Sequence, residues 1–314
     1  MPKLGCLSKI IIAVIVFLVL TVVGLLFFPV PPPEVHLEAE SIPGLPFFIT
    51  NTLLASLLTI LVLVVIFFTA TRRMKLVPGR WQSAVEIVFE WVLNLCEENA
   101  GKENGRRFFP IVATIFFYII MAALLSLLPG FEVIGYGHPA PPEGVPGAFA
   151  GSYHGWIVDI PLLRKANTDI NFPLALALVS FVFVEFMGIK TLGFSRYISR
   201  FISLGELIRG LGLLLRGKIR SGISAIFMGV IELFAGLIEI ISEFIRVVSL
   251  TFRLFGNMTA GMILLLIISF LTPWVVGVPF YGLEALFGFV QALIFAGLTL
   301  AFAIIAVTPR ELHE

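Results

Sequence analysis

The stretch from residue 247 to residue 271 reads VVSLTFRLFGNMTAGMILLLIISFL. As a helix it is long enough to cross the hydrocarbon core of a bilayer, which is about 30 Å thick. It nevertheless carries Arg253 in its first half and Asn257 one helical turn later. Arginine stays charged at physiological pH, and placing it inside a membrane costs several kcal/mol. The position therefore indicates either a charge with a function or an arginine that snorkels to the membrane surface.

The composition as a whole is typical of an integral membrane protein that crosses the bilayer several times. Hydrophobic residues make up 59% of the 314 residues, charged residues make up 13%, and the mean hydropathy is +1.04. This hydropathy exceeds what a soluble core of this length needs. A formal net charge of +1 argues against a broad nucleic-acid interface, and two cysteines, Cys6 and Cys96, are too few for a disulfide framework or a metal site. We expect neither a nucleic-acid partner nor a cofactor.

Two hydrophobic segments of spanning length lie near the N-terminus. Residues 10–28 follow two lysines and precede a proline-rich run, and they predict an uncleaved membrane anchor or, alternatively, a cleaved signal peptide. Residues 46–70 end at basic residues that mark the cytoplasmic side of the membrane (Arg72, Arg73, Lys75 and Arg80). The N-terminus is therefore expected in the cytoplasm. We divide the chain into an anchor with a proline-rich outer segment, residues 1–45, and a main domain, residues 46–314.

The middle of the chain predicts three further membrane segments. Residues 81–98 carry acidic and amide side chains at near-helical spacing, which indicates an amphipathic interfacial helix or a less hydrophobic span. Residues 108–128 form a clean span that leads into a loop at about residues 130–167. The loop is rich in Gly and Pro and has no excess of positive charge, so we expect an extended chain on the outer side. Residues 172–187 return to the cytoplasm, where basic residues outnumber acidic ones between residues 190 and 220.

The C-terminal region contains more helix-compatible sequence than one upright span can use. Residues 223–271 would extend for about 70 Å at 1.5 Å per residue, more than twice the hydrocarbon thickness. They predict either two spans joined by a tight turn or one very long helix that is steeply tilted and partly buried against protein. Residues 280–307 form the last hydrophobic segment. The fold class that we predict is all-α, a polytopic membrane protein with two long, steeply tilted C-terminal helices.

Polar residues follow one face of both C-terminal segments. Glu239, Arg246 and Arg253 are spaced by seven residues, which make two helical turns within about 20°. The three charges therefore share a face and cannot all point to lipid. The last segment repeats this spacing with Glu284 and Gln291. We expect both polar faces to contact protein or water.

The segment Arg253–Gly261, RLFGNMTAG, strongly resembles the signature of subunit a of the rotary F-type ATP synthases, the membrane stator beside the c-ring. The resemblance runs in the right order from about residue 46 to residue 307. It leaves the N-terminal anchor and the outer loop, which looks like an insertion, outside the usual pattern. Further matching positions are Pro78-Gly79 with Gln82 and Glu86, Phe109-Pro110, Leu127-Leu128-Pro129, Asp169-Ile170-Asn171, Glu239 and Gln291.

This resemblance implies the neighbours and the location of the chain. The two C-terminal helices are expected to pack against the c-subunit ring, and the peripheral-stalk b subunits, the remainder of the F-type ATP synthase and membrane lipids are the other expected partners. The complex is expected in the inner (plasma) membrane of a bacterium, with the C-terminus in the cytoplasm. No phosphate-binding Gly-x-x-x-x-Gly-Lys-Ser/Thr loop occurs in the sequence, so we expect no catalytic site for ATP in this chain.

The resemblance also implies a role for Arg253, the residue that matches the signature arginine. In the family this arginine stands opposite the c-subunit carboxylates, between two aqueous half-channels that open to opposite membrane faces. A carboxylate that arrives protonated from lipid has its pKa lowered by the guanidinium and releases its proton. The arginine also blocks a direct proton leak between the half-channels. Rotation of the ring then becomes necessary for net transport.

Other residues match half-channel positions of the family. We expect an ion path with Arg253 between the two half-channels, Asn257, Glu284 and Gln291 on the outer side, Glu239, Ser242 and Ser249 on the inner side, and Asp169 before the span at residues 172–187. The family position of Met262 is often a glutamate, and that of Glu284 is then often a histidine. A single carboxylate moved across the helix pair could serve the same proton relay.

Simpler interpretations exist for several of these residues. Ser242 and Ser249 could satisfy only local carbonyl groups, and Asp169 could cap the following helix. The neighbouring Glu243 and Arg246 could form a pair within one helix. Two glycines of the signature, Gly256 and Gly261, could serve only close helix packing.

A different functional class is also compatible with buried charge in a membrane helix. A self-contained secondary transporter could use Arg253 and Glu239 to bind its substrate, but such proteins usually consist of two similar halves with broken helices. The sequence contains no convincing internal repeat. The stator of a rotary ATP synthase is therefore the favoured interpretation, and the sequence leaves open whether the coupling ion is a proton or sodium.

Overall fold

The computed structural model describes most of the main domain. The described residues are 39–44, 46, 48–75, 77–128, 131, 134–139, 156–199, 201, 205–215, 219–271 and 277–308, together with 12, 14–16, 18, 19, 22 and 23. Most of the predicted N-terminal anchor, the proline-rich run, the tip of the outer loop and the tail after residue 308 lie outside the described residues. The division of the chain at residue 45 therefore stays a prediction.

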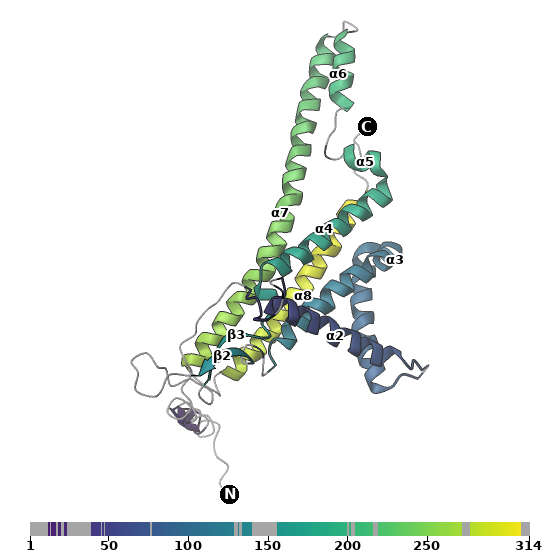
Figure 1. The fold of residues 1–314 in the computed structure, drawn as a ribbon. Helices are drawn as coiled ribbons and strands as arrows, with labels where there is room; N and C mark the ends of the chain where they lie inside the picture. The colour runs from purple at the N-terminus through teal and green to yellow at the C-terminus, as the bar shows by residue number, and fades with distance from the viewer. Residues whose placement is uncertain are drawn as a thin grey trace. The chain divides into compact units, whose positions relative to one another are not determined.

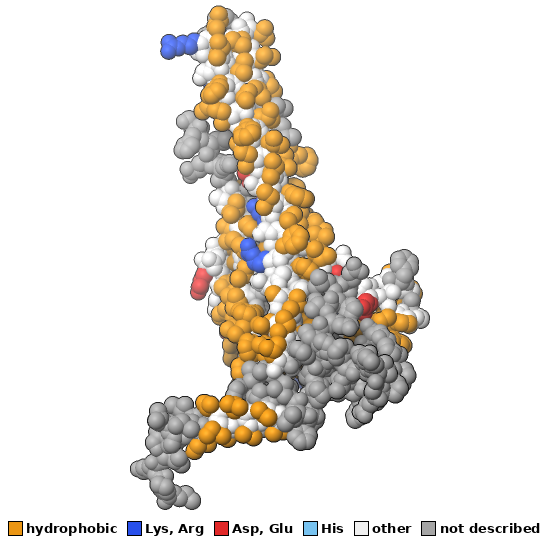
Figure 2. Space-filling view, turned by 90° about the vertical axis from the view of Figure 1, so that its left-hand side faces the viewer, with side chains coloured by type: hydrophobic (Ala, Val, Ile, Leu, Met, Phe, Trp, Pro, Cys, Tyr) orange, Lys and Arg blue, Asp and Glu red, His pale blue; other side chains and the backbone are white. Residues whose placement is uncertain are grey.

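The described chain is almost entirely helical, and five of its helices are long and apolar enough to cross a membrane (Figure 1). These five are α2 (Asn51–Thr71), α3 (Arg80–Leu125), α4 (Asn171–Leu192), α7 (Ile219–Leu271) and α8 (Gly277–Val307). Hydrophobic side chains cover most of the surface that Figure 2 draws for the described residues. The prediction of an all-α, polytopic membrane protein with long C-terminal helices is confirmed.

Helix α7 decides between the two alternatives for the C-terminal region. It runs without interruption for 53 residues, or about 80 Å at 1.5 Å per residue, and no turn divides it into two spans. The sequence explains this continuity, because α7 contains no proline, and Pro273 follows closely after its end. Within the most apolar 18-residue stretch of α7, only 11% is buried inside the chain. The corresponding stretch of α8 is 50% buried. Most of the α7 surface is therefore left for lipid or for another subunit.

Helix α3 contains a sharp break that separates two predicted segments. Gly101 has φ 78° and ψ 161°, a backbone conformation that side-chain-bearing residues rarely adopt. The part before Gly101 corresponds to the predicted interfacial helix, and the part after it to the predicted span. Gly105 packs so closely on the backbone of Cys96 that a Cβ atom would lie 2.7 Å from the Cys96 carbonyl oxygen. Two glycines therefore shape this turn.

The short elements connect the long helices. Helices α5 (Phe194–Ser199) and α6 (Gly205–Leu215) follow α4 and precede α7 in the sequence. Helix α6 runs beside the first turns of α7 (Figure 1). The antiparallel strands β2 (Gly135–Pro139) and β3 (Trp156–Pro161) belong to the predicted outer loop and were not expected from the sequence. The one-turn 3-10 helix η1 (Ala166–Thr168) then leads into α4. Helix α2 begins five residues later than predicted, because Thr50 caps it by accepting a hydrogen bond from the Leu53 N–H at 3.3 Å.

The helices form two compact units that alternate along the sequence. The first unit consists of Met1–Val85, Phe116–Phe172 and Leu254–Ile294, and the second of Glu86–Ile115, Pro173–Arg253 and Phe295–Glu314. In the first unit, Tyr118 donates a hydrogen bond to Ser56 at 2.8 Å. In the second unit, a hydrogen bond of 2.8 Å joins the hydroxyl groups of Ser180 and Thr299. Buried hydroxyl pairs thus link helices inside each unit.

The α3 turn generates a first prediction. Gly105→Ala should lower the thermal unfolding midpoint of the protein in detergent, because the added methyl overlaps the Cys96 backbone; overpacking of this kind costs about 1–3 kcal/mol. Gly212→Ala is the matched control, since nothing lies within 4 Å of a Cβ atom at that α6 position. Equal midpoints for the two variants would contradict the close packing of this turn.

Candidate functional site

A buried ion pair joins the outer loop to helix α8. Lys165 Nζ donates a hydrogen bond to Glu284 Oε1, and each side chain is only 5% exposed. Gly261 of α7 faces the other carboxylate oxygen, and a Cβ atom at residue 261 would overlap Glu284 Oε2. Because buried charges in proteins are normally paired, Lys165 compensates the charge of Glu284. Glu284 is therefore fixed between the loop and α7.

A second polar contact joins α7 to α8 at a neighbouring level, earlier on α7 and later on α8. Asn257 Nδ2 donates a hydrogen bond of 2.7 Å to Gln291 Oε1. Gln291 follows Glu284 by seven residues on α8, and Asn257 precedes Gly261 by four residues on α7. The two helices therefore meet at two successive polar levels in the same unit. The three residues predicted for the outer half-channel, Asn257, Glu284 and Gln291, all belong to these contacts.

Several buried polar atoms in this unit have no hydrogen-bond partner in the described chain. They are Asn51 Nδ2, both amide atoms of Asn167, Thr259 Oγ1 and Gln291 Nε2. They belong to α2, η1, α7 and α8. Buried polar atoms are normally satisfied by protein or by ordered water. These elements therefore offer hydrogen-bonding sites that water can use.

Arg253 differs from the other arginine on its helical face. Arg253 is partly exposed on α7 and forms no hydrogen bond or ion pair with the part of the chain that the structure describes. Arg246 pairs with Glu243 at 2.6 Å, and its guanidinium lies 3.9 Å from the centroid of the Phe302 ring. The pair within one helix that the sequence allowed is confirmed for Glu243 and Arg246. Among these two arginines, only Arg253 keeps its guanidinium available to another molecule.

The residues predicted for the inner half-channel lie on α7 before Arg253. Glu239 is half-buried, whereas Ser242 and Ser249 are exposed. Ser242 donates a hydrogen bond to the carbonyl oxygen of Ile238 at 2.8 Å, which agrees with the simpler local interpretation of this serine. Glu239 precedes Arg253 by 14 residues, or about 21 Å along the helix. Glu239 and Asn257 therefore lie on opposite sides of Arg253 along one continuous helix.

Asp169 lies at the junction of the outer loop and α4. Its carboxylate accepts hydrogen bonds from the Thr52 hydroxyl at 3.0 Å and from the backbone and side-chain nitrogens of Asn171 at 3.1 and 3.0 Å. These contacts fix the start of α4 and connect it to α2, as the capping interpretation expects. A role of Asp169 in ion transport stays a prediction.

The sequence predicted Glu284 but missed its partner. Lys165 lies near the end of a loop in which no functional charge was expected. The signal in the sequence was the pair Arg164-Lys165, placed only four residues before Asp169 in a loop with few other cations. Both side chains are buried.

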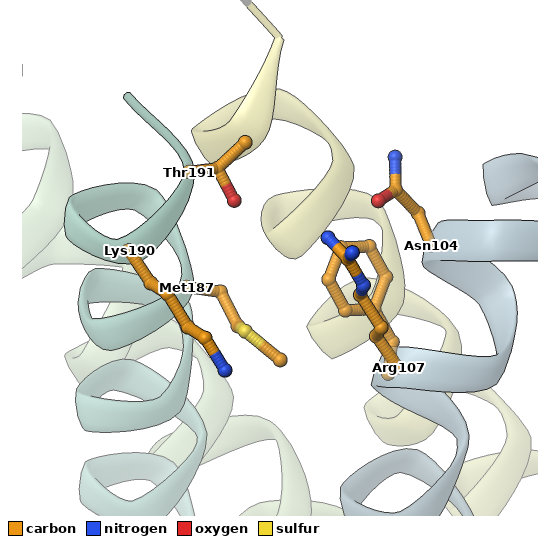
Figure 3. Close-up of a pocket in the computed structure, with 6 residues that line it drawn as sticks. Asn104, Arg107, Met187, Lys190 and Thr191 are labelled. Carbon is orange, nitrogen blue, oxygen red and sulfur yellow. The ribbon is translucent and has the colours of Figure 1, made fainter. Parts of the chain in front are cut away.

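A cavity of about 510 Å³ has none of the predicted ion-path residues in its lining. It is lined by Asn104, Arg107, Phe108, Met187, Lys190 and Thr191 (Figure 3). Arg107 pairs with Glu103 at 2.7 Å, and the Lys190 ammonium lies 5.9 Å from the centroid of the Phe186 ring. Both cations of the cavity therefore have contacts of their own.

The chain is similar to known proteins over most of its length. Residues 53–303 match the profile of the family described as ATP synthase A chain. A protein named ATP synthase subunit a from a Nitratiruptor species is 30% identical over 264 residues, which cover 84% of this chain and 91% of that protein. Proteins of the same name from Campylobacter jejuni and Campylobacter concisus are 30% and 28% identical, and each match covers 82% of this chain and 89% of the relative.

The contact between Gly261 and Glu284 generates a second prediction. Gly261→Ala should destabilise the protein by about 1–3 kcal/mol, because the added methyl occupies the place of the Glu284 carboxylate. The temperature at which the detergent-solubilised protein aggregates measures this effect. Gly256→Ala, on the same helix but with nothing within 4 Å of its Cβ position, should aggregate near the wild-type temperature. A Gly261→Ala protein as stable as Gly256→Ala would show that Glu284 lies elsewhere.

Proposed function

This chain belongs to the ATP synthase A chain family, and from that premise we propose that it conducts protons through two offset half-channels to and from the carboxylates of a c-ring. It is a multi-pass membrane subunit of an F-type ATP synthase with a role in ion transport. In the proposal, proton flow through this stator drives rotation of the ring, and ATP chemistry takes place in other subunits. Family membership argues against a self-contained secondary transporter.

The observation that carries the proposal is the guanidinium of Arg253. It lies on a long apolar helix and has no hydrogen-bond or ion-pair partner in the described chain. A charge at such a place needs a counter-charge or water, because an isolated ion in a membrane is costly. A carboxylate of a neighbouring c subunit supplies this counter-charge in the proposed complex. The largely unburied surface of α7 supports such a neighbour.

The outer half-channel is proposed to follow the polar contacts between α7 and α8. Protons from the outer side would reach Glu284, pass the pair Asn257 and Gln291, and arrive one helical turn from Arg253. The buried polar atoms without protein partners support this path, because they can hold a chain of water molecules. A carboxylate within such a chain can accept and donate the proton.

The inner half-channel is proposed to open from the opposite end of α7. Glu239, Ser242 and Ser249 precede Arg253 by about four, three and one helical turns. Their partial or full exposure is compatible with a water-lined surface beside the c-ring. The proposed location is the inner (plasma) membrane of a bacterium, with both termini in the cytoplasm and the peripheral-stalk b subunits as further neighbours.

The role of Arg253 generates a third prediction. Arg253→Ala should reduce both ATP synthesis and ATP-driven proton pumping to background in membrane vesicles, while the complex still assembles. Arg253→Lys should fail or nearly fail as well, because lysine can lose its proton in a site of low dielectric and lacks the planar guanidinium. Normal coupled synthesis by Arg253→Ala would contradict the proposed function.

A control on the same helical face sharpens this test. The double variant Glu243→Gln with Arg246→Gln removes an arginine seven residues before Arg253, together with the carboxylate that pairs with it. Because both members of the ion pair are replaced together, the variant should retain coupled ATP synthesis. If this control lost coupling as completely as Arg253→Ala, the assay would not distinguish Arg253 from any arginine on that face.

The two half-channels generate a fourth prediction. Glu284→Gln should impair the response of ATP synthesis to pH on the outer side, and Glu239→Gln its response to pH on the inner side. Both effects should be milder than the loss of Arg253, because water and neighbouring polar groups can partly bridge the gap. The measurement varies the pH on one side of the membrane at a time.

The reactivity of introduced cysteines tests independently to which side of the membrane each half-channel opens. Cysteines at Asn257 and Gln291 should react with a small, membrane-impermeant thiol reagent added from outside. If these positions react only from the inside while residue 239 is open to the outside, the assignment of the half-channels is reversed. If neither glutamine variant changes proton flux, both glutamates are structural.

A further inference from the structure

The segment before α4 is a buried part of a loop. Loop segments usually lie on the surface, because their backbone polar groups need partners. Within residues 164–168, four polar side chains are at most 5% exposed: Arg164, Lys165, Asn167 and Thr168. Thr168 binds back to the carbonyl oxygen of Lys165 through its N–H at 3.1 Å and its hydroxyl at 2.7 Å. The loop is therefore folded inward and closed on itself at Lys165.

The Lys165 ammonium makes a charged contact between this segment and helix α8. It reaches Glu284, although the two residues are 119 positions apart in the sequence. Gly261 leaves room for the carboxylate on the opposite side, so Glu284 is held from two directions. Both amide atoms of Asn167, two residues after Lys165, are buried without a protein partner in the described chain. The segment thus combines a fixed cation with hydrogen-bonding sites that water can use.

We propose that Lys165 is a positioning residue of the outer half-channel, and that its ammonium holds the Glu284 carboxylate in the place from which protons pass to the Asn257–Gln291 pair. The inference rests on the proposed function and adds to it a residue from the outer loop. A proton that arrives from the outer side binds Glu284 and removes the negative charge that Lys165 holds. Once Glu284 passes the proton to water beside Gln291, the ion pair forms again. Segment 164–168 is in this way the outer wall of the path.

A double variant distinguishes a Lys165 that acts through Glu284 from one that acts independently of it. If Lys165 acts by holding Glu284, the loss of Lys165 matters only while residue 284 carries a charge. Lys165→Met should therefore lower ATP synthesis driven by an acidic outer side several-fold in the wild-type background. The same change in the Glu284→Gln background should cause no further loss, because an uncharged amide needs no ammonium partner. Lys165→Arg preserves the positive charge and should retain most of the synthesis.

The test uses the complete ATP synthase in membrane vesicles, with ATP synthesis and the amount of assembled complex measured for each variant. Lys102→Met, at an exposed lysine outside the proposed path, is the matched control and should match the wild type. If Lys165→Met does not assemble because Glu284 is left buried and unpaired, the double variant with Glu284→Gln should assemble again, since it removes both charges. This rescue supports the same pairing by a readout that does not depend on transport.

Two outcomes would overturn the inference. Unchanged synthesis in Lys165→Met would show that Glu284 does not need the ammonium, and additive losses in the double variant would show that Lys165 acts independently of Glu284. Neither outcome bears on Arg253. Failure of the proposed function is recognised separately, because Arg253→Ala would then retain coupled synthesis whatever the Lys165 variants do.

Discussion

A positive charge on a membrane helix must be neutralised, and the chain supplies no hydrogen-bond or ion-pair partner for Arg253 in its described part. Arg246, seven residues earlier on α7, demonstrates the ordinary solution, since it binds Glu243 and stacks on Phe302. Arg246 is thus neutralised within the chain, whereas the guanidinium of Arg253 is left for contacts with other molecules. An arginine that remains available on a largely unburied helix needs a counter-charge or water, and a c-ring carboxylate is the counter-charge that we propose.

Polar residues of α7 and α8 lie before and after Arg253 along the chain. Because α7 is one continuous helix of 53 residues, Glu239 lies about 21 Å before Arg253 along it and Asn257 lies about one turn after Arg253. On one side, contacts to α8 and to the outer loop bury Glu284 and Gln291 in a polar, water-compatible setting. On the other side, Glu239 and the two serines line α7 itself. Two paths that end near one arginine, yet do not connect past it, are the arrangement that the proposal requires.

Hydropathy and helical period predicted most of the fold, because burial in lipid restricts membrane segments to long apolar helices. The same reasoning could not choose between a turn and a continuous α7, since both satisfy the pattern, and it missed β2 and β3 in a loop rich in Gly and Pro. Within the candidate site, spacing and resemblance predicted Asn257, Glu284 and Gln291, which make polar contacts in the structure, while their role in ion transport stays a prediction. The pairing of Glu284 with Lys165 was out of reach, because a contact between residues 119 positions apart depends on how the loop folds inward and not on a local pattern.

A map of the complete complex at side-chain resolution would show what lies opposite Arg253. We expect a c-subunit carboxylate within ion-pair distance of the Arg253 guanidinium, with α7 and α8 steeply tilted along the curved surface of the ring. Helices within about 30° of the membrane normal would contradict the predicted tilt. A guanidinium that faces lipid headgroups, or a subunit other than the c-ring, would contradict the role of Arg253 itself.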